Sequence, residues 1–153
     1  MTIACKLSEI ADAISGISIS GVTVLDRNQV VPAWPLTANV LYPKPDGLVS
    51  DIVPTYVSLS HDSGAQIDLT YTLTYRFLGV RVASDGTFQA VNYSDLIDKA
   101  ILIVNAMIAV HAPYSGKVDM TFGGISNVGA LTDPAGNLSY GCDITLNITE
   151  QQN

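Results

Sequence analysis

The segment that most constrains the fold of this 153-residue chain is "QIDLTYTLTYRFLGVRVA", residues 66–83. Apolar and polar side chains alternate in its first half, which predicts a β-strand with one buried face formed by Leu69, Tyr71, Leu73, Tyr75 and Phe77. The apolar positions then change parity at Gly79, to Leu78, Val80 and Val82. This change predicts either a β-bulge at Leu78 and Gly79 that returns the same face to the core, or a second half buried on its other face, for example by a partner chain.

Two segments show helical periodicity. Near the N-terminus one apolar stripe recurs at spacings of four, three, four and three, and Gly16 follows it: Ile3, Leu7, Ile10, Ile14 and Ile17. A second helix is predicted at about 94–110, capped by Ser94 or Asn92, with Asp95 and Asp98 in its first turn. This second helix is apolar around most of its circumference, so we expect the first helix or another subunit to cover part of it.

The remaining segments predict strands and turns. Five prolines between residues 21 and 54 favour short strands, at 22–25, 38–42 and 56–59. "KVDMTF" predicts a strand with Val118, Met120 and Phe122 inward, the glycine-rich segment 123–137 predicts a long loop, and "YGCDITLNITE" predicts a closing strand. Together these elements predict one α+β domain, residues 1–153, with a single mixed, mainly antiparallel sheet flanked by an N-terminal helix and a crossover helix.

Charge and composition exclude several functions. Fourteen acidic residues against seven basic ones give a net charge of −7, and the basic residues are scattered singly, so we expect no tight binding of nucleic acid. The acidity fits repulsion of nearby DNA, or simply solubility. Lys6 and Glu9 interrupt any signal-peptide core, and the apolar run 100–110 is too short to span a bilayer, so no membrane partner is expected. Cys5 and Cys142 are expected to be free thiols.

The sequence contains no recognisable catalytic constellation. His61 and His111 lack partners at metal-ligand spacing, and adjacent residues in "HDS" cannot adopt the geometry of a catalytic triad. "GGISNVG" lacks the Lys-Ser/Thr of a phosphate loop and leads to a strand. We therefore expect no enzyme, and no catalytic, cofactor or metal site.

Apolar side chains in the predicted long loop favour an assembly contact instead: Ile125, Val128 and Leu131. Trp34, between two prolines, is either a core residue or an exposed anchor. With Leu78, Val80 and Val82, these residues are the predicted contacts with another subunit or partner.

The order of these elements resembles that of the tail terminator, or tail-completion, proteins of long-tailed bacteriophages. The resemblance spans nearly the whole chain: a helix at the N-terminus, "VTVLD", "VLYPKPDG", "TYTLTYRFLGVRV", the helix "YSDLIDKAILIVNAM", "KVDMTF" and "YGCDITLNITE". It implies a virion protein of the tail and neck, assembled in the host cytoplasm, that forms a six-fold ring on the head-proximal end of the tail tube. Such a ring would contact the tail tube protein and the head–tail connector protein, and DNA would pass through its lumen without specific binding.

Other functions remain open on the sequence alone. Another phage neck or tail tube component would share the small size, acidic charge and many strands. A small-ligand-binding α+β domain could use the Tyr71 and Tyr75 face as a pocket wall, and an enzyme could carry a site built from scattered residues.

Overall fold

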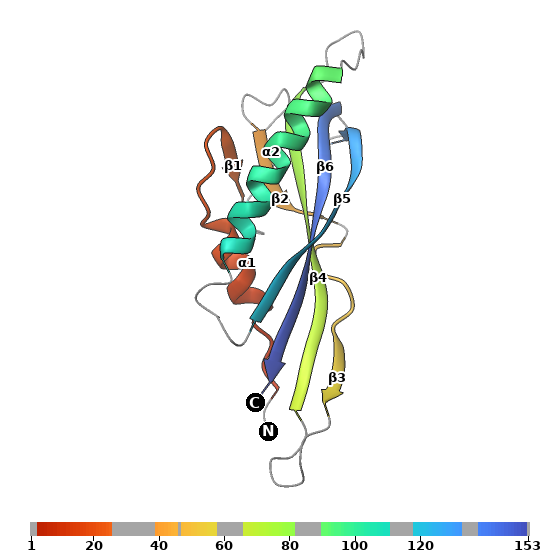
Figure 1. The fold of residues 1–153 in the computed structure, drawn as a ribbon. Helices are drawn as coiled ribbons and strands as arrows, with labels where there is room; N and C mark the ends of the chain where they lie inside the picture. The colour runs from red at the N-terminus through yellow and green to blue at the C-terminus, as the bar shows by residue number, and fades with distance from the viewer. Residues whose placement is uncertain are drawn as a thin grey trace.

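Residues 3–25, 39–45, 47–57, 66–81, 90–110, 118–132 and 138–152 are described by a computed structural model. Within these ranges the chain is an α+β protein with two helices and a single six-stranded mixed sheet, mostly antiparallel, which confirms the predicted fold class (Figure 1). The main path of the sheet runs in the order β1 (Val22–Val24), β2 (Asn39–Pro43), β4 (Gln66–Arg81), β6 (Leu138–Gln152) and β5 (Val118–Thr132). β3 (Val53–Val57) pairs with the first part of β4. Among the paired neighbours in the described part of the chain, only β1 and β2 run parallel, and the other pairs are antiparallel.

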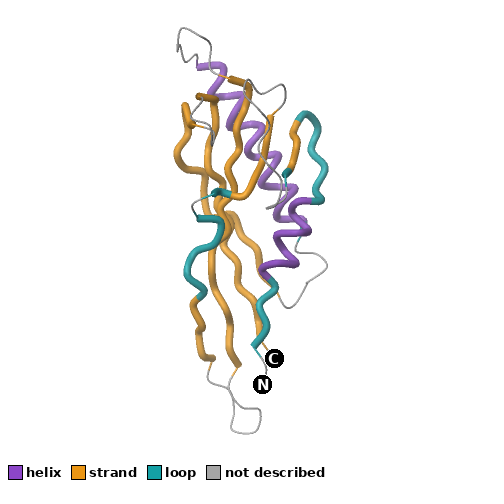
Figure 2. The backbone as a smooth tube through the Cα atoms, turned by 180° about the vertical axis from the view of Figure 1, so that it is seen from behind, coloured by secondary structure: helices purple, strands orange, loops and turns teal. Residues whose placement is uncertain are grey.

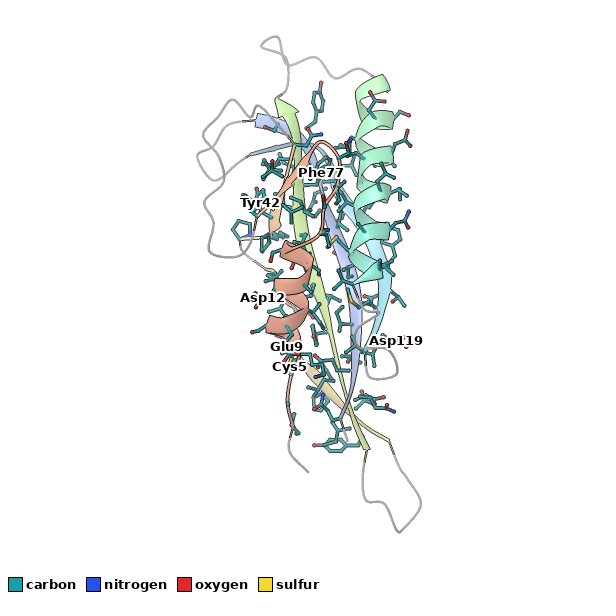
Figure 3. All side chains as sticks on the ribbon, turned by 90° about the vertical axis from the view of Figure 1, so that its left-hand side faces the viewer. Cys5, Glu9, Asp12, Tyr42, Phe77 and Asp119 are labelled. Carbon is teal, nitrogen blue, oxygen red and sulfur yellow. The ribbon has the colours of Figure 1, made fainter. Side chains whose placement is uncertain are left out.

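The long strand β4 is central and has the buried face that its alternation predicts. The odd-numbered side chains from Leu69 to Phe77 are all buried. Those from Tyr71 to Phe77 belong to a core that also contains Ile144, Leu146 and Ile148 of β6. Phe77 lies in the layer between the sheet and the helices (Figure 3). Both helices cover this one face.

The second helix, α2 (Ala90–Ala109), is the predicted crossover. It leads from β4 to β5, which run parallel to each other because each is antiparallel to β6 between them. Its core stripe consists of Leu96, Ala100, Ile103, Val104 and Met107. The predicted start at residue 94 is wrong: the helix begins at Ala90, so Asp95 and Asp98 lie beyond its first turn. Polar residues typical of a cap also fit within a helix when they point to solvent, and Ser94 and Asp95 are exposed.

The N-terminal helix, α1 (Leu7–Ser15), is shorter than the predicted stripe. Ile10 and Ile14 are fully buried, and the helix ends before Gly16 as expected. Ile3 was predicted on this stripe, but it precedes the helix and is 55% exposed. Two hydrogen bonds hold residues 4–6 against the end of β6 instead: the N–H of Ala4 donates to Gln152 Oε1 at 2.9 Å, and that of Lys6 donates to Glu150 Oε1 at 2.7 Å.

The parity change in β4 has two structural causes. Leu78 follows the regular alternation onto the opposite face of the sheet, where it is fully buried in a second, smaller cluster with Leu25, Val40 and Tyr42. A register shift follows between Leu78 and Arg81. The predicted bulge therefore exists, but it begins after Leu78 and does not return Leu78 to the main core.

The predicted loop at 123–137 is wrong for residues 123–132, because β5 continues to Thr132 alongside β6. Two register shifts, between Phe122 and Gly124 and between Ser126 and Gly129, interrupt the alternation and conceal the strand in the sequence. Phe122 was predicted to be buried, but it is 44% exposed at the sheet edge beside the first shift.

The strands β2 and β3 lie one after the other along the same edge of β4. The link between them stays close to β4: the Lys44 N–H donates to the Thr74 carbonyl at 3.1 Å, and the Thr74 N–H donates to the Leu48 carbonyl at 2.7 Å (Figure 2). Predicted strands 22–25 and 38–42 match β1 and β2 within one residue at each end. β3 begins at Val53, three residues before its predicted start, and residues 58 and 59 lie outside the described part of the chain.

Candidate assembly surfaces

One row across the sheet is buried in its middle and exposed at both ends. It runs from Val49 beside β4, through Leu73 and Leu146, to Phe122 on β5. Leu73 and Leu146 are fully buried, whereas Val49 is 37% exposed and Phe122 is 44% exposed. Opposite edges of the subunit thus each present an exposed apolar residue, Val49 on one and Phe122 on the other, in the same row of the sheet.

The β5 edge lacks most of the features that protect edge strands. Among the described strands only β6 pairs with β5, so the outer side of this 15-residue strand has no neighbour there. Edge strands in soluble proteins are usually blocked by lysine, proline or shortness. Residues 118–132 contain one charged residue, Asp119, and no proline. The two register shifts bend the middle of β5 but leave Val118–Phe122 in regular pairing.

The opposite edge carries the larger apolar patch. Ile52 is 42%, Val53 51% and Tyr56 69% exposed along the same edge as Val49. Tyr56 pairs with Ile67 and lies on the face of Val49, whereas Val53 pairs with Thr70 and lies on the other face of the sheet. β3 pairs only with β4 among the described strands, and Pro54 suits an edge strand because proline has no N–H to donate. We use the name β3-side patch for the exposed apolar residues along this edge, Val49, Ile52, Val53 and Tyr56, and the name β5-side patch for those along the other edge, Phe122 and Val128.

The helical layer does not cover the whole sheet. β4 spans about 50 Å at about 3.3 Å per residue, whereas the 20 residues of α2 span about 30 Å. The lower part of the sheet, around β3, therefore extends past α2 (Figure 1). On α2 itself Ile101 is 40% and Leu102 57% exposed, so its outer side is partly apolar as the sequence predicts.

A buried carboxylate ties four segments together on the sheet face opposite the helices. Asp143 is fully buried and accepts hydrogen bonds from Arg76 Nε at 2.8 Å, Arg76 Nη2 at 3.1 Å and Asn127 Nδ2 at 2.7 Å, while Lys44 Nζ lies 3.7 Å away. Burial acts to raise the pKa of Asp143, but the hydrogen bonds and the two cations outweigh it and lower that pKa. The cluster joins β4, β5, β6 and the end of β2.

A second buried carboxylate, that of Glu150, holds the residues just before α1. Glu150 Oε2 accepts a hydrogen bond from the Tyr71 hydroxyl at 2.5 Å and from Cys5 Sγ at 3.3 Å, and Oε1 accepts the Lys6 N–H described above. Burial and the neighbouring Glu150 raise the pKa of Tyr71, so the phenol remains a donor. Cys5 lies just before the first turn of α1 (Figure 3). We assign this cluster a structural role, because it anchors the segment that leads into α1.

A small cavity lies between the last part of β4 and the first half of α2. It has a volume of about 200 Å³ and is lined by Phe77, Gly79, Leu96, Asp95, Lys99, Asn39 and Tyr140. Tyr71 and Tyr75, predicted as a possible pocket wall, do not line it; they are 4% and 2% exposed and belong to the main core.

The residues predicted to contact another subunit differ in how exposed they are. Val128 is 39% exposed and remains available. Ile125 packs partly buried against the main core, and Leu131 packs against the second cluster. Leu78 is not available as a surface contact because its own chain buries it fully. Only the backbone of Val80 is described, while Val82 and Trp34 lie outside the described residues.

Sequence reasoning missed Val49, Ile52, Val53 and Tyr56 as exposed apolar residues. They stand between prolines and polar turn residues, where no periodicity separates an exposed side chain from a buried one. The sequence signal at Phe122 is the pair of glycines that follows it, because glycines inside a strand pattern are typical of a bulge that ends the regular alternation.

The described residues hold no group of three His, Cys, Asp or Glu side chains placed to bind a metal ion. The two histidines of the sequence, His61 and His111, lie outside the described residues. None of the helices in the described part of the chain is both long and apolar enough to cross a bilayer. Cys5 and Cys142 are free thiols, and burial raises the pKa of Cys142 to about 12.

Comparison with known proteins gave no relative: no protein-family model matches the chain, and no curated protein matches it.

Proposed function

We propose that this chain is a virion structural protein that forms a ring on the head-proximal end of a phage tail tube and joins the tail to the head connector. The proposal combines the resemblance of the element order with one structural observation. That observation is the row of the sheet that ends in Val49 on one edge and Phe122 on the other, both exposed.

A ring of identical subunits needs two different patches on each subunit, since one patch meets the other patch of the next subunit until the circle closes. The β3-side and β5-side patches meet this requirement. They lie at opposite edges of one sheet and include residues in the same row, so neighbouring subunits standing side by side would bring Phe122 close to Val49.

Strand directions support the same arrangement. β2 and β3, which flank the link containing Val49, run antiparallel to β4, whereas β5 runs parallel to β4. Rotation about an axis along the strands preserves their directions, so the meeting edges of two neighbours would be antiparallel. Antiparallel pairing is slightly more stable per residue than parallel pairing.

The proposed partners follow from the ring. One rim would contact the tail tube protein and the other the head–tail connector protein, with DNA passing through the lumen. The net charge of −7 disfavours tight contact with DNA phosphates. In this proposal the chain has a structural role in the virion and is not an enzyme.

Cysteine cross-linking tests the contact directly. A Val49→Cys, Phe122→Cys double variant, made in a Cys5→Ser background, places thiols three inter-strand spacings apart within one subunit, about 14 Å. A disulfide needs Cα atoms within about 7 Å, so it can form only between subunits. We expect oxidation to give a ladder of oligomers that ends at a closed ring on a denaturing gel.

The matched control pairs Val49→Cys with Asp98→Cys, an exposed position on α2 away from both sheet edges. It should remain mainly monomeric. Equal ladders from both pairs, or monomer alone from the first pair, would refute the edge-to-edge contact.

A further inference from the structure

The cavity beside Gly79 exists because this position has no side chain. A Cβ built at Gly79 would lie 3.3 Å from the Tyr140 carbonyl oxygen, 3.7 Å from Asn39 Oδ1 and 4.0 Å from Leu96 Cδ1. The positive-φ glycines among the described residues are Gly21, Gly124 and Gly129. The backbone at Gly79 therefore does not require glycine, and the effect of the missing side chain is to leave space.

The walls of the cavity combine apolar and charged groups. Phe77 and Leu96 are 1% and 5% exposed and form an apolar floor. Asp95 and Lys99 stand four residues apart on α2, which places them on the same side of the helix. Lys99 Nζ is 3.4 Å from the Ser20 carbonyl, and no ion pair within the described residues joins it to Asp95. One anion and one cation are thus available above one apolar floor.

The size of the cavity restricts its ligand. Pockets for drug-sized molecules usually have volumes of about 300–1,000 Å³, and this cavity has about 200 Å³. A complementary ligand is small and carries an ammonium group, a carboxylate and a short apolar group.

We propose that this cavity binds a free α-amino acid with an apolar side chain. Its ammonium group faces Asp95, its carboxylate faces Lys99, and its side chain lies on Phe77 and Leu96. This site lies apart from the two edge patches, so the inference does not depend on ring formation.

Four probes that share an isobutyl group test the proposal on the full chain by NMR titration. L-Leucine carries both charges, 3-methylbutylamine only the positive one, 4-methylpentanoate only the negative one, and N-acetyl-L-leucinamide neither. We expect L-leucine to bind with a Kd of about 1 mM, the scale of a ligand with few atoms. Each removed charge should weaken binding about threefold, the scale of an exposed ion pair.

Variants locate the site. Asp95→Asn should abolish the tighter binding of L-leucine over 4-methylpentanoate, which lacks the ammonium group. Lys99→Gln should abolish the tighter binding of L-leucine over 3-methylbutylamine, which lacks the carboxylate. Asp98→Asn, on the same helix but outside the cavity, should change neither. Gly79→Ala should weaken L-leucine binding several-fold, whereas Gly47→Ala, whose Cβ meets nothing within 4 Å, should leave it unchanged.

Several results would overturn the inference. One is the absence of a saturable chemical-shift change with L-leucine at ten times the expected Kd. Another is binding of N-acetyl-L-leucinamide as tight as that of L-leucine. A third is an equal effect of Asp95→Asn and Asp98→Asn on the binding of L-leucine. If Gly79→Ala fails to fold, the charge variants still decide.

Discussion

At the scale of single residues, Asp143 shows how a buried charge can stabilise this sheet. Its carboxylate is fully removed from solvent, but it accepts three hydrogen bonds from Arg76 and Asn127 and lies near Lys44. Breaking such a cluster leaves the guanidinium of Arg76 partly buried without its anion. The cost of losing one partner of a buried pair is about 3–5 kcal/mol.

We predict that Asp143→Asn lowers the free energy of unfolding by about 3 kcal/mol at neutral pH. The pKa of Asp143 in the folded chain is below its ordinary value of 3.8, so its contribution is complete above that value and is lost as the pH falls through the folded pKa. The difference between wild type and variant should therefore narrow once the pH drops below 3.8.

Urea denaturation across this pH range measures the difference. Asp119→Asn, an exposed carboxylate on β5, serves as the control and should change stability by less than about 0.5 kcal/mol. A constant difference at all pH values would show that Asp143 does not act through its charge.

At the scale of elements, β5 depends on a residue in an unusual conformation. Asn127 has a φ of 53° within the second register shift, and its side chain donates to Asp143 at 2.7 Å. A non-glycine residue in this left-handed region costs about 1 kcal/mol or more. The hydrogen bond to a charged acceptor contributes about 1.5–3 kcal/mol, which offsets that strain.

We predict that Asn127→Ala destabilises the chain by about 3 kcal/mol, because it keeps the strain and loses the hydrogen bond. Asn127→Gly loses the same hydrogen bond but also removes the strain, so it should cost about 1 kcal/mol less than alanine. Chemical denaturation provides the values, and Ser126→Ala, at the exposed neighbouring position, is the control. If glycine costs more than alanine, the left-handed backbone of Asn127 is not a source of strain.

These local features explain which elements the sequence predicted. β4 and β6 keep a period of two through the buried centre of the sheet, so alternation alone identifies their buried faces. β5 has two register shifts within eight residues, from Phe122 to Gly129, and its alternation changes phase at each shift. The glycines that allow the shifts also resemble those of a loop, which is why residues 123–132 were predicted as one.

The surfaces were harder to predict than the strands. Leu78 has the same apolar character whether its own chain or a partner buries it, and only the fold shows that Leu25, Val40 and Tyr42 surround it. The exposure of Val49 and Phe122 depends on where the sheet ends, which is a property of strand order. Periodicity shows which face of a strand is apolar, but it does not show which strand lies at the edge.

At the scale of the whole molecule, the sheet is longer than the helical layer and has apolar side chains at both edges. One edge carries Val49, Ile52, Val53 and Tyr56, and the other carries Phe122 and Val128. The exposed fraction of each of these residues lies between 37% and 69%. Exposed apolar patches on soluble proteins usually mark contacts with other molecules. Two distinct patches at opposite edges favour a closed ring over a two-fold dimer, in which one patch would meet itself.

Negative-stain electron microscopy of the purified full chain, alone and mixed with tail tubes, tests the proposed ring most directly. We predict six-fold rings from the chain alone and a single cap on one end of each tube. Asp substitutions at Val49 and Phe122 should abolish the rings, whereas Asp98→Asn should preserve them. Monomers at micromolar concentration that leave tube ends bare, or tubes of indefinite length built from the chain itself, would contradict a terminating ring.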